Sequence, residues 1–573
     1  MPVHNAEIAG IFNQIADLLE IEGANQFRVR AYRNAARTIG GLPRSVADLI
    51  EEGQDLTELP GIGEDLAGKI EEIVETGSLV QLEEIKRRTP PELADLLKIS
   101  GLGPKRVQAL REELGIVSRE DLEQAARQGK VQQLDGFGEK IEQGILQDIE
   151  RAKGEEERTL LMVAEQIVEP LVDYLREGGR VENVIVAGSY RRRKETVGDL
   201  DILATSEESA KAIERFVEYE DVEEVDSKGE TRSTVVLRSG MQVDLRVVPQ
   251  GSYGAALLYF TGSKSHNIAL RNMALEQDLK INEYGVFKGE DQIAGQTEEE
   301  IYDICDLPYI PPELRENRGE LEAASNGQLP QMIALEDLRG DLQSHTKASD
   351  GNASLKEIAQ AAQDRGYEYF AITDHSKYVA VTQGLDAEGL ARQIEEIDRL
   401  NGQLEGIVLL KGVEVDILED GSLDLPDDIL KELDLTICSI HSKFDLSREE
   451  QTERIIRAMD NPYFNILAHP TGRLIGERAP YDVDMERVME AAQERGCFLE
   501  VNAQPDRLDI NDVYCKMAKE MGLKIAISTD AHSVNELDYL RFGVGQARRG
   551  WLEAEDVLNT RSWKELRKLL KRS

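Results

Sequence analysis

One stretch of the chain, residues 184–204, reads VIVAGSYRRRKETVGDLDILA. An apolar run that predicts a β-strand is followed by a Gly-Ser turn, a basic run and a second apolar strand that contains Asp199 and Asp201. Because side chains alternate between the two faces of a strand, these two aspartates are expected to share a face. Another short strand, QVDLRVV at 242–248, adds Asp244. The sequence therefore predicts a sheet that brings three carboxylates together.

Three carboxylates buried together repel one another strongly, and a bound divalent cation is the simplest remedy. Hard carboxylate oxygens suit Mg²⁺ or Mn²⁺, and paired ions of this kind support phosphoryl transfer. In the preceding turn, Gly188 lets the backbone approach a phosphate and Ser189 can donate a hydrogen bond, while Arg192 can pair with triphosphate oxygens. Taken alone, an Asp-x-Asp pair can be a solvated strand end and a Gly-Ser pair can be any turn. The full combination favours nucleotidyl transfer.

These residues resemble the nucleotidyltransferases of DNA polymerase family X. Further along, the segment GAALLYFTGSKSHNIALR is similar to the nucleotide-selecting stretch of that family. The resemblance implies that three residues of this segment line the sugar pocket of an incoming deoxynucleotide: Tyr259, Phe260 and Gly262. It also implies that Asn267 contacts the base in the minor groove and that Arg271 contacts the template strand. Without the resemblance, a Tyr-Phe pair is more often a core contact.

Three segments near the amino end share a pattern in which Gly-x-Gly precedes an apolar helix: 56–70, 96–110 and 131–145. Free backbone N–H groups at the start of such a helix can bind one DNA phosphate without reading the base sequence. Each copy resembles a helix-hairpin-helix motif. We expect the first two copies to hold DNA through these residues: Gly61, Gly63, Gly101, Gly103 and Lys105. The third copy is equally consistent with structural packing.

Some eukaryotic members of family X remove a 5′-deoxyribose phosphate with a lysine after the first hairpin, and the matching residue here is Lys69. A Schiff base requires a lysine whose pKa is lowered by burial or by nearby positive charge. Four acidic residues surround Lys69 instead: Glu64, Asp65, Glu71 and Glu72. They would stabilise its charged form, so the sequence argues against lyase activity.

Five of the seven histidines lie between residues 345 and 532, each at the end of an apolar, strand-like run. In a (β/α) barrel the carboxyl ends of the strands converge on one face. With three acidic residues, these histidines form a set of candidate ligands: His345, Asp350, His375, Glu414, His441, His469, Asp530 and His532. Imidazoles and carboxylates suit zinc, manganese or iron, and the set is too large for one tetrahedral ion. We expect two or three ions. A single histidine at a strand end is more often a core residue, but five such cases disfavour that interpretation.

Residues 338–573 resemble a PHP domain, a family whose members hydrolyse phosphoesters at a multinuclear metal centre. That family opens with His-x-His, whereas this chain has Gln343, Ser344 and His345. An amide oxygen is a poorer ligand than imidazole for such metals, so one metal position could be weak. Three interpretations stay open for this domain. It could be a metal-dependent 3′–5′ exonuclease that could also cleave at abasic sites, a degenerate scaffold for the polymerase, or a small-molecule phosphoesterase that supplies the main activity.

The composition sets broader limits. At 573 residues the chain exceeds the roughly 250 to 300 residues at which single cores stop growing. No apolar run of about 18 residues occurs, which argues against a membrane span. The net charge of −42 would argue against nucleic acid, but basic clusters stand out locally, as at 191–194. Four widely spaced cysteines suggest reduced thiols and a cytoplasmic protein.

Together the resemblance spans nearly the entire chain and is that of bacterial and archaeal family X DNA polymerases with a C-terminal PHP domain. It implies a multidomain α+β and α/β protein with a helical head, a palm with a mixed sheet and an irregular (β/α)7-type barrel. The expected domains are as follows: an N-terminal lyase-like domain at 1–85, a helix-hairpin-helix domain at 86–155, a palm at 156–250, a nucleotide-binding, thumb-like domain at 251–318, a linker at 319–337 and the PHP domain at 338–573. The expected function is template-directed synthesis from dNTPs at short gaps during repair. The expected partner is gapped or primer-template DNA; no protein partner is indicated.

Overall fold

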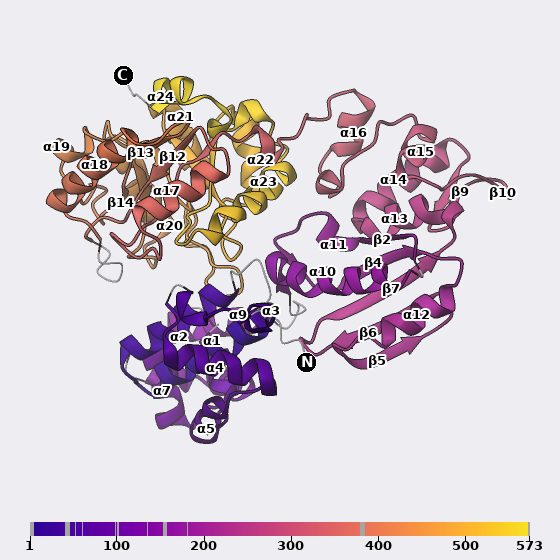
Figure 1. Ribbon diagram of the computed structural model, residues 1–573, viewed down its shortest axis with the longest axis horizontal. Coiled ribbons are helices and arrows are strands. Elements are labelled where there is room, and N and C mark those ends of the chain that lie inside the picture. The colour runs from indigo at the N-terminus through magenta and orange to yellow at the C-terminus, as the bar shows by residue number, and fades with distance from the viewer. Residues whose placement is uncertain are drawn as a thin grey trace.

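The computed structural model describes residues 5–40, 46–51, 53–59, 61–97, 99, 102–134, 136–152, 158–179, 181–378 and 384–570. Figure 1 shows three lobes: a helical head at the amino end, a lobe built around a sheet at the right of the view, and a C-terminal barrel. This arrangement confirms the expected multidomain fold class. Among the described residues, no helix combines the length and apolar character that a membrane span requires.

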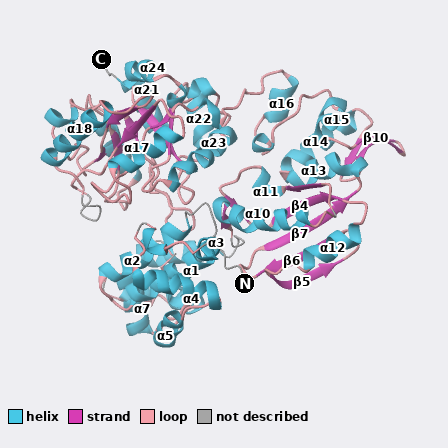
Figure 2. Ribbon diagram, viewed as in Figure 1, coloured by secondary structure: helices cyan, strands magenta, loops and turns pink. Residues whose placement is uncertain are grey.

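Every regular element described in the head is helical (Figure 2). Its α-helices are α1 (Asn5–Ile21), α2 (Gln26–Gly40), α3 (Val46–Glu51), α4 (Glu64–Thr76), α5 (Val80–Arg88), α6 (Glu92–Leu96), α7 (Pro104–Leu114), α8 (Arg119–Arg127) and α9 (Glu139–Ala152). Two apolar cores hold them together. Phe12 and Ile70 belong to the first core, and Val107 and Ile145 belong to the second.

The palm is a mixed five-stranded sheet with the order β2-β4-β7-β6-β5. Its strands are β2 (Asn183–Val186), β4 (Leu200–Thr205), β5 (Val222–Lys228), β6 (Arg232–Leu237) and β7 (Gln242–Val248), and its helices are α10 (Leu161–Glu177), α11 (Gly188–Arg191) and α12 (Ser209–Val217). Strands β1 (Thr159–Leu160) and β3 (Thr196–Val197) form a separate two-stranded antiparallel sheet. Strands β4 and β7 are parallel, whereas the other neighbours in the sheet are antiparallel.

The two faces of this sheet are covered by different helices. Ile202 and Ala204 of β4 share a core with residues of α10 and α12. Leu203, which points to the other face, packs on Ala256 and Leu257 of α13 (Tyr253–Thr261). Because side chains alternate along β4, Asp201 lies on the α13 face as well.

The thumb-like region follows with α13, α14 (Lys264–Glu276), β8 (Lys280–Asn282), β9 (Gly285–Lys288), β10 (Asp291–Ala294), α15 (Glu298–Ile304) and α16 (Glu320–Ser325). Its small antiparallel sheet has the order β10-β9-β8. Helix α16 lies within the segment 319–337, whose composition predicts a linker. Leu321 and Ala324 of this helix join the core around Tyr302, so part of that segment is folded onto the thumb.

The C-terminal barrel consists of parallel strands wrapped by helices. The strands are β11 (Gly340–Asp341), β12 (Tyr369–Ile372), β13 (Val408–Lys411), β14 (Glu414–Asp416), β15 (Ile437–Ser439), β16 (Ile466–Leu467), β17 (Phe498–Asn502) and β18 (Ile525–Ser528). The helices are α17 (Leu355–Asp364), α18 (Ala387–Asn401), α19 (Asp427–Leu430), α20 (Arg448–Ala458), α21 (Met485–Arg495), α22 (Asp512–Met521), α23 (Leu540–Arg549) and α24 (Trp563–Leu570).

Only two residues separate β13 from β14, so the described part of the barrel has seven strands when these two are counted as one. A parallel bridge between His375 and Glu414 joins its two sheets. A second parallel bridge, between Ser344 and Ala531, joins the first strand's end to the last strand's end. The expected irregular (β/α)7-type barrel is confirmed.

Candidate active sites in the palm and the barrel

The three palm aspartates meet as the sequence indicated, with one difference. Asp201 and Asp244 are direct partners in the parallel register of β4 and β7. Asp199 lies in a bend one residue before β4, so the strand alternation invoked for the pair does not place it. Burial, together with repulsion from Asp199 and Asp244, raises the pKa of Asp201 to about 7. The trio is therefore close enough to repel, and its oxygen donors fit a divalent cation.

The turn before these aspartates requires glycine. Gly188 has a φ of +62°, and a Cβ there would lie 2.9 Å from Oδ2 of Asp201. The absence of a side chain lets the start of α11 approach the carboxylate. Arg192, at the end of this turn, donates from Nε to Oε1 of Glu316 at 3.0 Å and from Nη1 to the carbonyl of Thr261 at 2.5 Å.

A cavity of about 430 Å³ opens beside the aspartates. It contains all eight residues for which the sequence predicted nucleotide contacts: Gly188, Ser189, Arg192, Tyr259, Phe260, Gly262, Asn267 and Arg271. Asp199 and Asp201 also line it. Asn267 donates to the carbonyl of Tyr259 at 2.7 Å, which ties α14 to the end of α13.

Three cations in the cavity lining were not among the sequence candidates: Arg158, Lys194 and Lys264. Lys194 belongs to the basic run at 191–194, which gave a signal for it. Arg158 directly precedes β1 and donates to the carbonyl of Thr196 in β3 at 2.7 Å. No motif in the sequence marks that contact. The added positive charge suits a ligand with several phosphates.

The glycine hairpins of the head form helix starts, as expected. Gly63 precedes α4 and Gly103 precedes α7, and neither helix has a side chain capping its first turn. Gly61 has a φ of +75°, which its turn requires, and Lys105 is exposed. Gly101 lies outside the described residues. Pro104, the first residue of α7, has no N–H, but no N-cap side chain occupies the remaining backbone donors at these two helix starts, which can contact phosphate.

Lys69 is held in its charged form. Its ammonium group donates to Oδ2 of Asp65 and lies 5.2 Å from the centre of the Tyr32 ring. Partial burial acts to lower the pKa of Lys69, but the hydrogen bonds with Asp65 and Tyr32 raise it above its ordinary value. A lysine with a raised pKa is a poor Schiff-base nucleophile at neutral pH.

We therefore expect borohydride to trap no covalent complex between this protein and DNA that carries a 5′-deoxyribose phosphate. A denaturing gel with labelled DNA measures the complex, and Lys69→Ala is the matched control. A complex that forms with the unchanged chain and disappears with Lys69→Ala would contradict this expectation.

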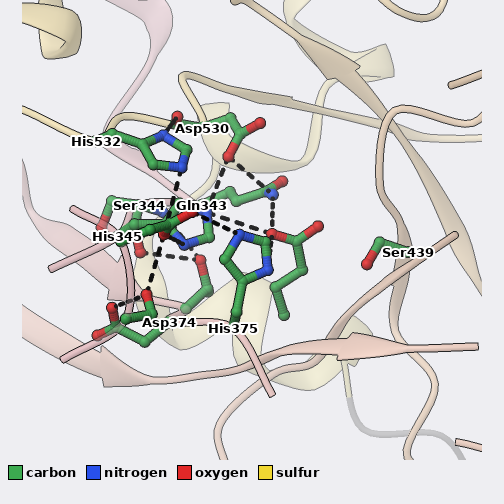
Figure 3. A network of polar contacts seen from close by, with 12 residues as sticks. Gln343, Ser344, His345, Asp374, His375, Ser439, Asp530 and His532 are labelled. Carbon is green, nitrogen blue, oxygen red and sulfur yellow. Dashed lines mark hydrogen bonds and ion pairs between the residues drawn. The ribbon is translucent and has the colours of Figure 1, made fainter. Parts of the chain in front are cut away.

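All eight candidate ligands of the barrel gather at the carboxyl ends of its strands. Figure 3 shows His345, His375, Asp530 and His532 directed toward one another. Three groups have ligand atoms within 4.8 Å of one another: His345, Asp350, His375 and His532; His375, Glu414 and His441; and His345, Glu414 and Asp530. His469 joins through a contact of 3.1 Å from Nε2 to Oε1 of Glu414. The eight side chains therefore form one cluster.

Glu414 lies at the centre of this cluster. Its Oε2 lies 3.3 Å from Nε2 of His345 and 3.4 Å from Nδ1 of His375, and its Oε1 lies 3.3 Å from Nε2 of His441. Burial acts to raise the pKa of Glu414, but the surrounding imidazoles hold it well below its usual range. Burial likewise opposes protonation of His441, yet hydrogen bonds to Asp416 and Glu414 raise its pKa to about 10. Here carboxylates stabilise the protonated form of buried imidazoles. Metal ions could replace those protons, so the arrangement fits a metal site.

Gln343 presents its amide nitrogen to the centre. Nε2 donates to Oε2 of Glu414 at 3.1 Å and to Oδ1 of Asp530 at 3.3 Å, whereas the buried Oε1 has no hydrogen-bond partner. The amide therefore lies where a cation would contact both carboxylates. This geometry fits the expected weak metal position.

Three residues that orient the ligands were not among the candidates from the sequence. Asp416 lies 3.2 Å from Nδ1 of His441, Asn502 donates to Asp530 at 3.0 Å, and Glu500 accepts from the backbone N–H of His469 at 2.8 Å. The contact from Asp416 fixes which nitrogen of His441 faces a metal, whereas the other two contacts orient the Asp530 carboxylate and the His469 backbone. Asp416 could have been found, because it stands two residues after Glu414 on the same strand.

We expect Gln343→His to strengthen metal binding. An imidazole at this position adds a ligand where the amide now donates, so the variant should retain about one more ion per chain after gel filtration. Elemental analysis of the full-length protein measures the difference, with Gln343→Ala as the control that adds no ligand. Equal metal content in all three proteins would show that residue 343 does not limit loading.

The geometry defines a class: a nucleotidyltransferase palm joined to a helix-hairpin-helix head and a metal-binding barrel. Family models agree along the chain: Helix-hairpin-helix domain at residues 3–79, SAM-like Helix-hairpin-helix tandem at 93–151, DNA polymerase beta palm at 159–242, DNA polymerase beta thumb at 256–316 and PHP domain at 341–504.

Individual proteins that are similar in sequence also match these regions. The chain is 39% identical over 578 residues to the DNA polymerase/3'-5' exonuclease PolX of Bacillus subtilis, covering 100% of both chains. Over 38% of its length it is 34% identical to a probable phosphatase of Thermoanaerobacter sp., of which it covers 89%. A probable phosphatase of Acetivibrio thermocellus is 32% identical to this chain. The match covers 38% of this chain and 86% of the phosphatase. The chain belongs to the PolX family, the family X DNA polymerases with a C-terminal PHP domain.

Proposed function

We propose that this protein is a template-directed DNA polymerase that adds deoxynucleotides to a primer 3′-hydroxyl and fills short gaps in DNA repair. The single observation that carries this proposal is the cavity in which two of the three aspartates, the phosphate-binding turn and the sugar-pocket residues meet. The similarity to the Bacillus subtilis polymerase over the whole chain supports it.

Each group has a role in this proposal. Ser189 and Arg192, with Lys194 and Arg158, bind the triphosphate. Tyr259 and Phe260, which line the cavity, would close the sugar site and leave no room for a ribose 2′-hydroxyl. Asp199, Asp201 and Asp244 would hold Mg²⁺ or Mn²⁺. When bound, such ions lower the pKa of the primer hydroxyl and neutralise the leaving pyrophosphate.

DNA would be held by the head. Gly61, Gly63 and Gly103 expose backbone donors at two helix starts, and Lys105 adds a positive charge. Contacts of this kind bind phosphates in any base sequence, which suits an enzyme that acts at gaps. Primer extension on gapped DNA, compared with a DNA lacking a gap, tests the activity and the substrate together. Absence of any extension with Mg²⁺ or Mn²⁺ would overturn the proposal.

For the barrel we propose a metal-dependent 3′–5′ exonuclease that shortens primer ends, with cleavage at abasic sites as a second substrate to test. The eight convergent ligands would hold two or three ions, with Zn²⁺ or Mn²⁺ favoured by the mixture of imidazole and carboxylate. When bound, such ions activate water and polarise a phosphoryl oxygen. Shortening of a labelled primer in the absence of dNTPs measures the activity.

A second candidate for the barrel is a phosphoesterase that acts on small molecules, because curated proteins named as probable phosphatases match this region. Release of phosphate from a nucleoside monophosphate, compared with release of nucleotides from a primer end, separates the two. A cytoplasmic location is proposed as well, since all four cysteines are buried and none of them forms a disulfide.

A further inference from the structure

One helix of the barrel, α23, packs along the polymerase part of the molecule, on the side of the barrel that faces the palm and thumb in Figure 1. Its contact residues recur at helical spacing: Arg541, Phe542, Gly545, Arg548 and Arg549. Phe542 is part of the apolar core of the palm. A Cβ at Gly545 would lie 3.6 Å from Arg193, so the backbones approach closely. The barrel and palm therefore share a packed interface.

Arg549 reaches from this helix to the edge of the nucleotide cavity. Its side chain is only 3% exposed. Nη1 donates to the backbone carbonyl of Arg192 at 2.8 Å and to Oε1 of Glu316 at 3.0 Å, and Nη2 donates to Oδ2 of Asp512 at 2.6 Å. The planar guanidinium thus holds three acceptors in one geometry, which an ammonium group could not do as well.

Glu316 connects Arg549 to the cavity. The same oxygen, Oε1, accepts from Nε of Arg192 and from Nη1 of Arg549, each at 3.0 Å. Burial acts to raise the pKa of Glu316, but Arg192 and Arg549 hold it below its usual range. One carboxylate charge is thus shared between two guanidinium groups, which leaves net positive charge at Arg192. Without Arg549, Glu316 would neutralise Arg192 alone.

We propose that Arg549 of the PHP barrel is a positioning residue for nucleotide binding in the palm: it fixes the Arg192 backbone and shares the charge of Glu316, which keeps Arg192 available for triphosphate. The inference rests on the proposed polymerase function. It makes the barrel part of the polymerase site in addition to being a site of its own, whether or not the barrel hydrolyses DNA.

The substitution Arg549→Met is expected to fold. Asp512 keeps its ion pair with Arg318 at 2.9 Å, and Glu316 keeps Arg192, so neither carboxylate is left buried without a cation. Arg541→Met is the matched control. It removes an arginine from the same helix face, where Arg541 pairs with Glu165 at 2.5 Å rather than with a residue of the cavity.

In full-length protein, Arg549→Met should raise the KM for dNTP about tenfold, equivalent to about 1.4 kcal/mol, while kcat changes less than about threefold. Arg549→Lys should lie between this variant and the unchanged protein. Arg541→Met should leave both constants within about twofold. Binding of a fluorescent dNTP in the presence of Ca²⁺ should weaken by the same factor as KM rises.

The inference and the proposed function would be overturned by different results. Equal dNTP affinity in Arg549→Met and the unchanged protein would overturn the positioning role, as would an equal loss in Arg541→Met, which would indicate a general effect of the interface. Absence of primer extension by the unchanged protein would instead overturn the polymerase proposal, while the binding measurement would still test Arg549.

Discussion

Replacing Asp201 with Asn is expected to reduce primer extension on gapped DNA by on the order of 10³-fold or more, because catalytic groups that act as a unit lose most of their effect when one is removed. Asp201 is the member of the trio that lies next to both another aspartate and the Gly-Ser turn. It is the register partner of Asp244, and it lies against Gly188 in the turn proposed to bind phosphate. Asn keeps the shape and removes the charge.

The same substitution should not destabilise the fold when no divalent ion is present. The pKa of Asp201 is raised from 3.8 to about 7 by burial and by its two neighbours. An acid whose pKa is raised in the folded state makes the free energy of unfolding fall as pH increases between those two values. Asn cannot ionise, so Asp201→Asn should have an equal or higher melting temperature at pH 8 in a chelator.

Three measurements on one preparation therefore test the assignment: extension, melting temperature and primer shortening without dNTPs. Extension should be lost, while melting temperature and shortening should be retained. Asp199→Ala with Asp201→Ala should also abolish extension. Full extension by Asp201→Asn would show that the trio does not carry the chemistry.

The palm could be predicted from sequence because its site is built from local patterns. Gly188, Ser189 and Arg192 lie on one turn. Asp201 and Asp244 stand among apolar residues of strands β4 and β7, which pair directly. The barrel ligands could also be predicted, because each of the five histidines follows an apolar strand and the fold collects strand ends at one face.

Contacts between segments that are distant in the chain could not be predicted from the sequence. Arg158 reaches the cavity only because β1 pairs with β3, and Arg549 reaches Arg192 across 357 positions of the chain. Helix α16 was not predicted because the Gly, Asn and Pro residues of its segment are typical of a linker. Leu321 nevertheless packs into the apolar core of the thumb-like region. In each case tertiary packing decided the outcome, and local propensity carried no sign of it.

Replacing Glu414 with Gln is expected to remove most of the metal from the barrel and to reduce primer shortening by on the order of 10³-fold or more. Both oxygens of Glu414 contact imidazoles: Oε2 faces His345 and His375, and Oε1 faces His441 and His469. A neutral amide offers one oxygen instead of two charged ones, so it cannot serve both halves of the centre.

His441→Ala tests one half of the same centre. This residue contacts Glu414 and is oriented by Asp416, so its loss should also erase primer shortening while it leaves the ligands around His345 in place. Elemental analysis should then show partial metal loss in His441→Ala and a larger loss in Glu414→Gln.

The control for both variants is DNA synthesis in the same protein, which should stay within about twofold because the barrel reaches the nucleotide cavity through α23 and not through its metal ligands. Loss of synthesis along with shortening would mean that the barrel had unfolded or shifted, and the melting temperature would distinguish these cases. Retention of full shortening by Glu414→Gln would rule out hydrolysis at this centre. The remaining interpretation would then be the scaffold role that Gln343 suggests. In that role the barrel affects synthesis only through contacts such as those of Arg549.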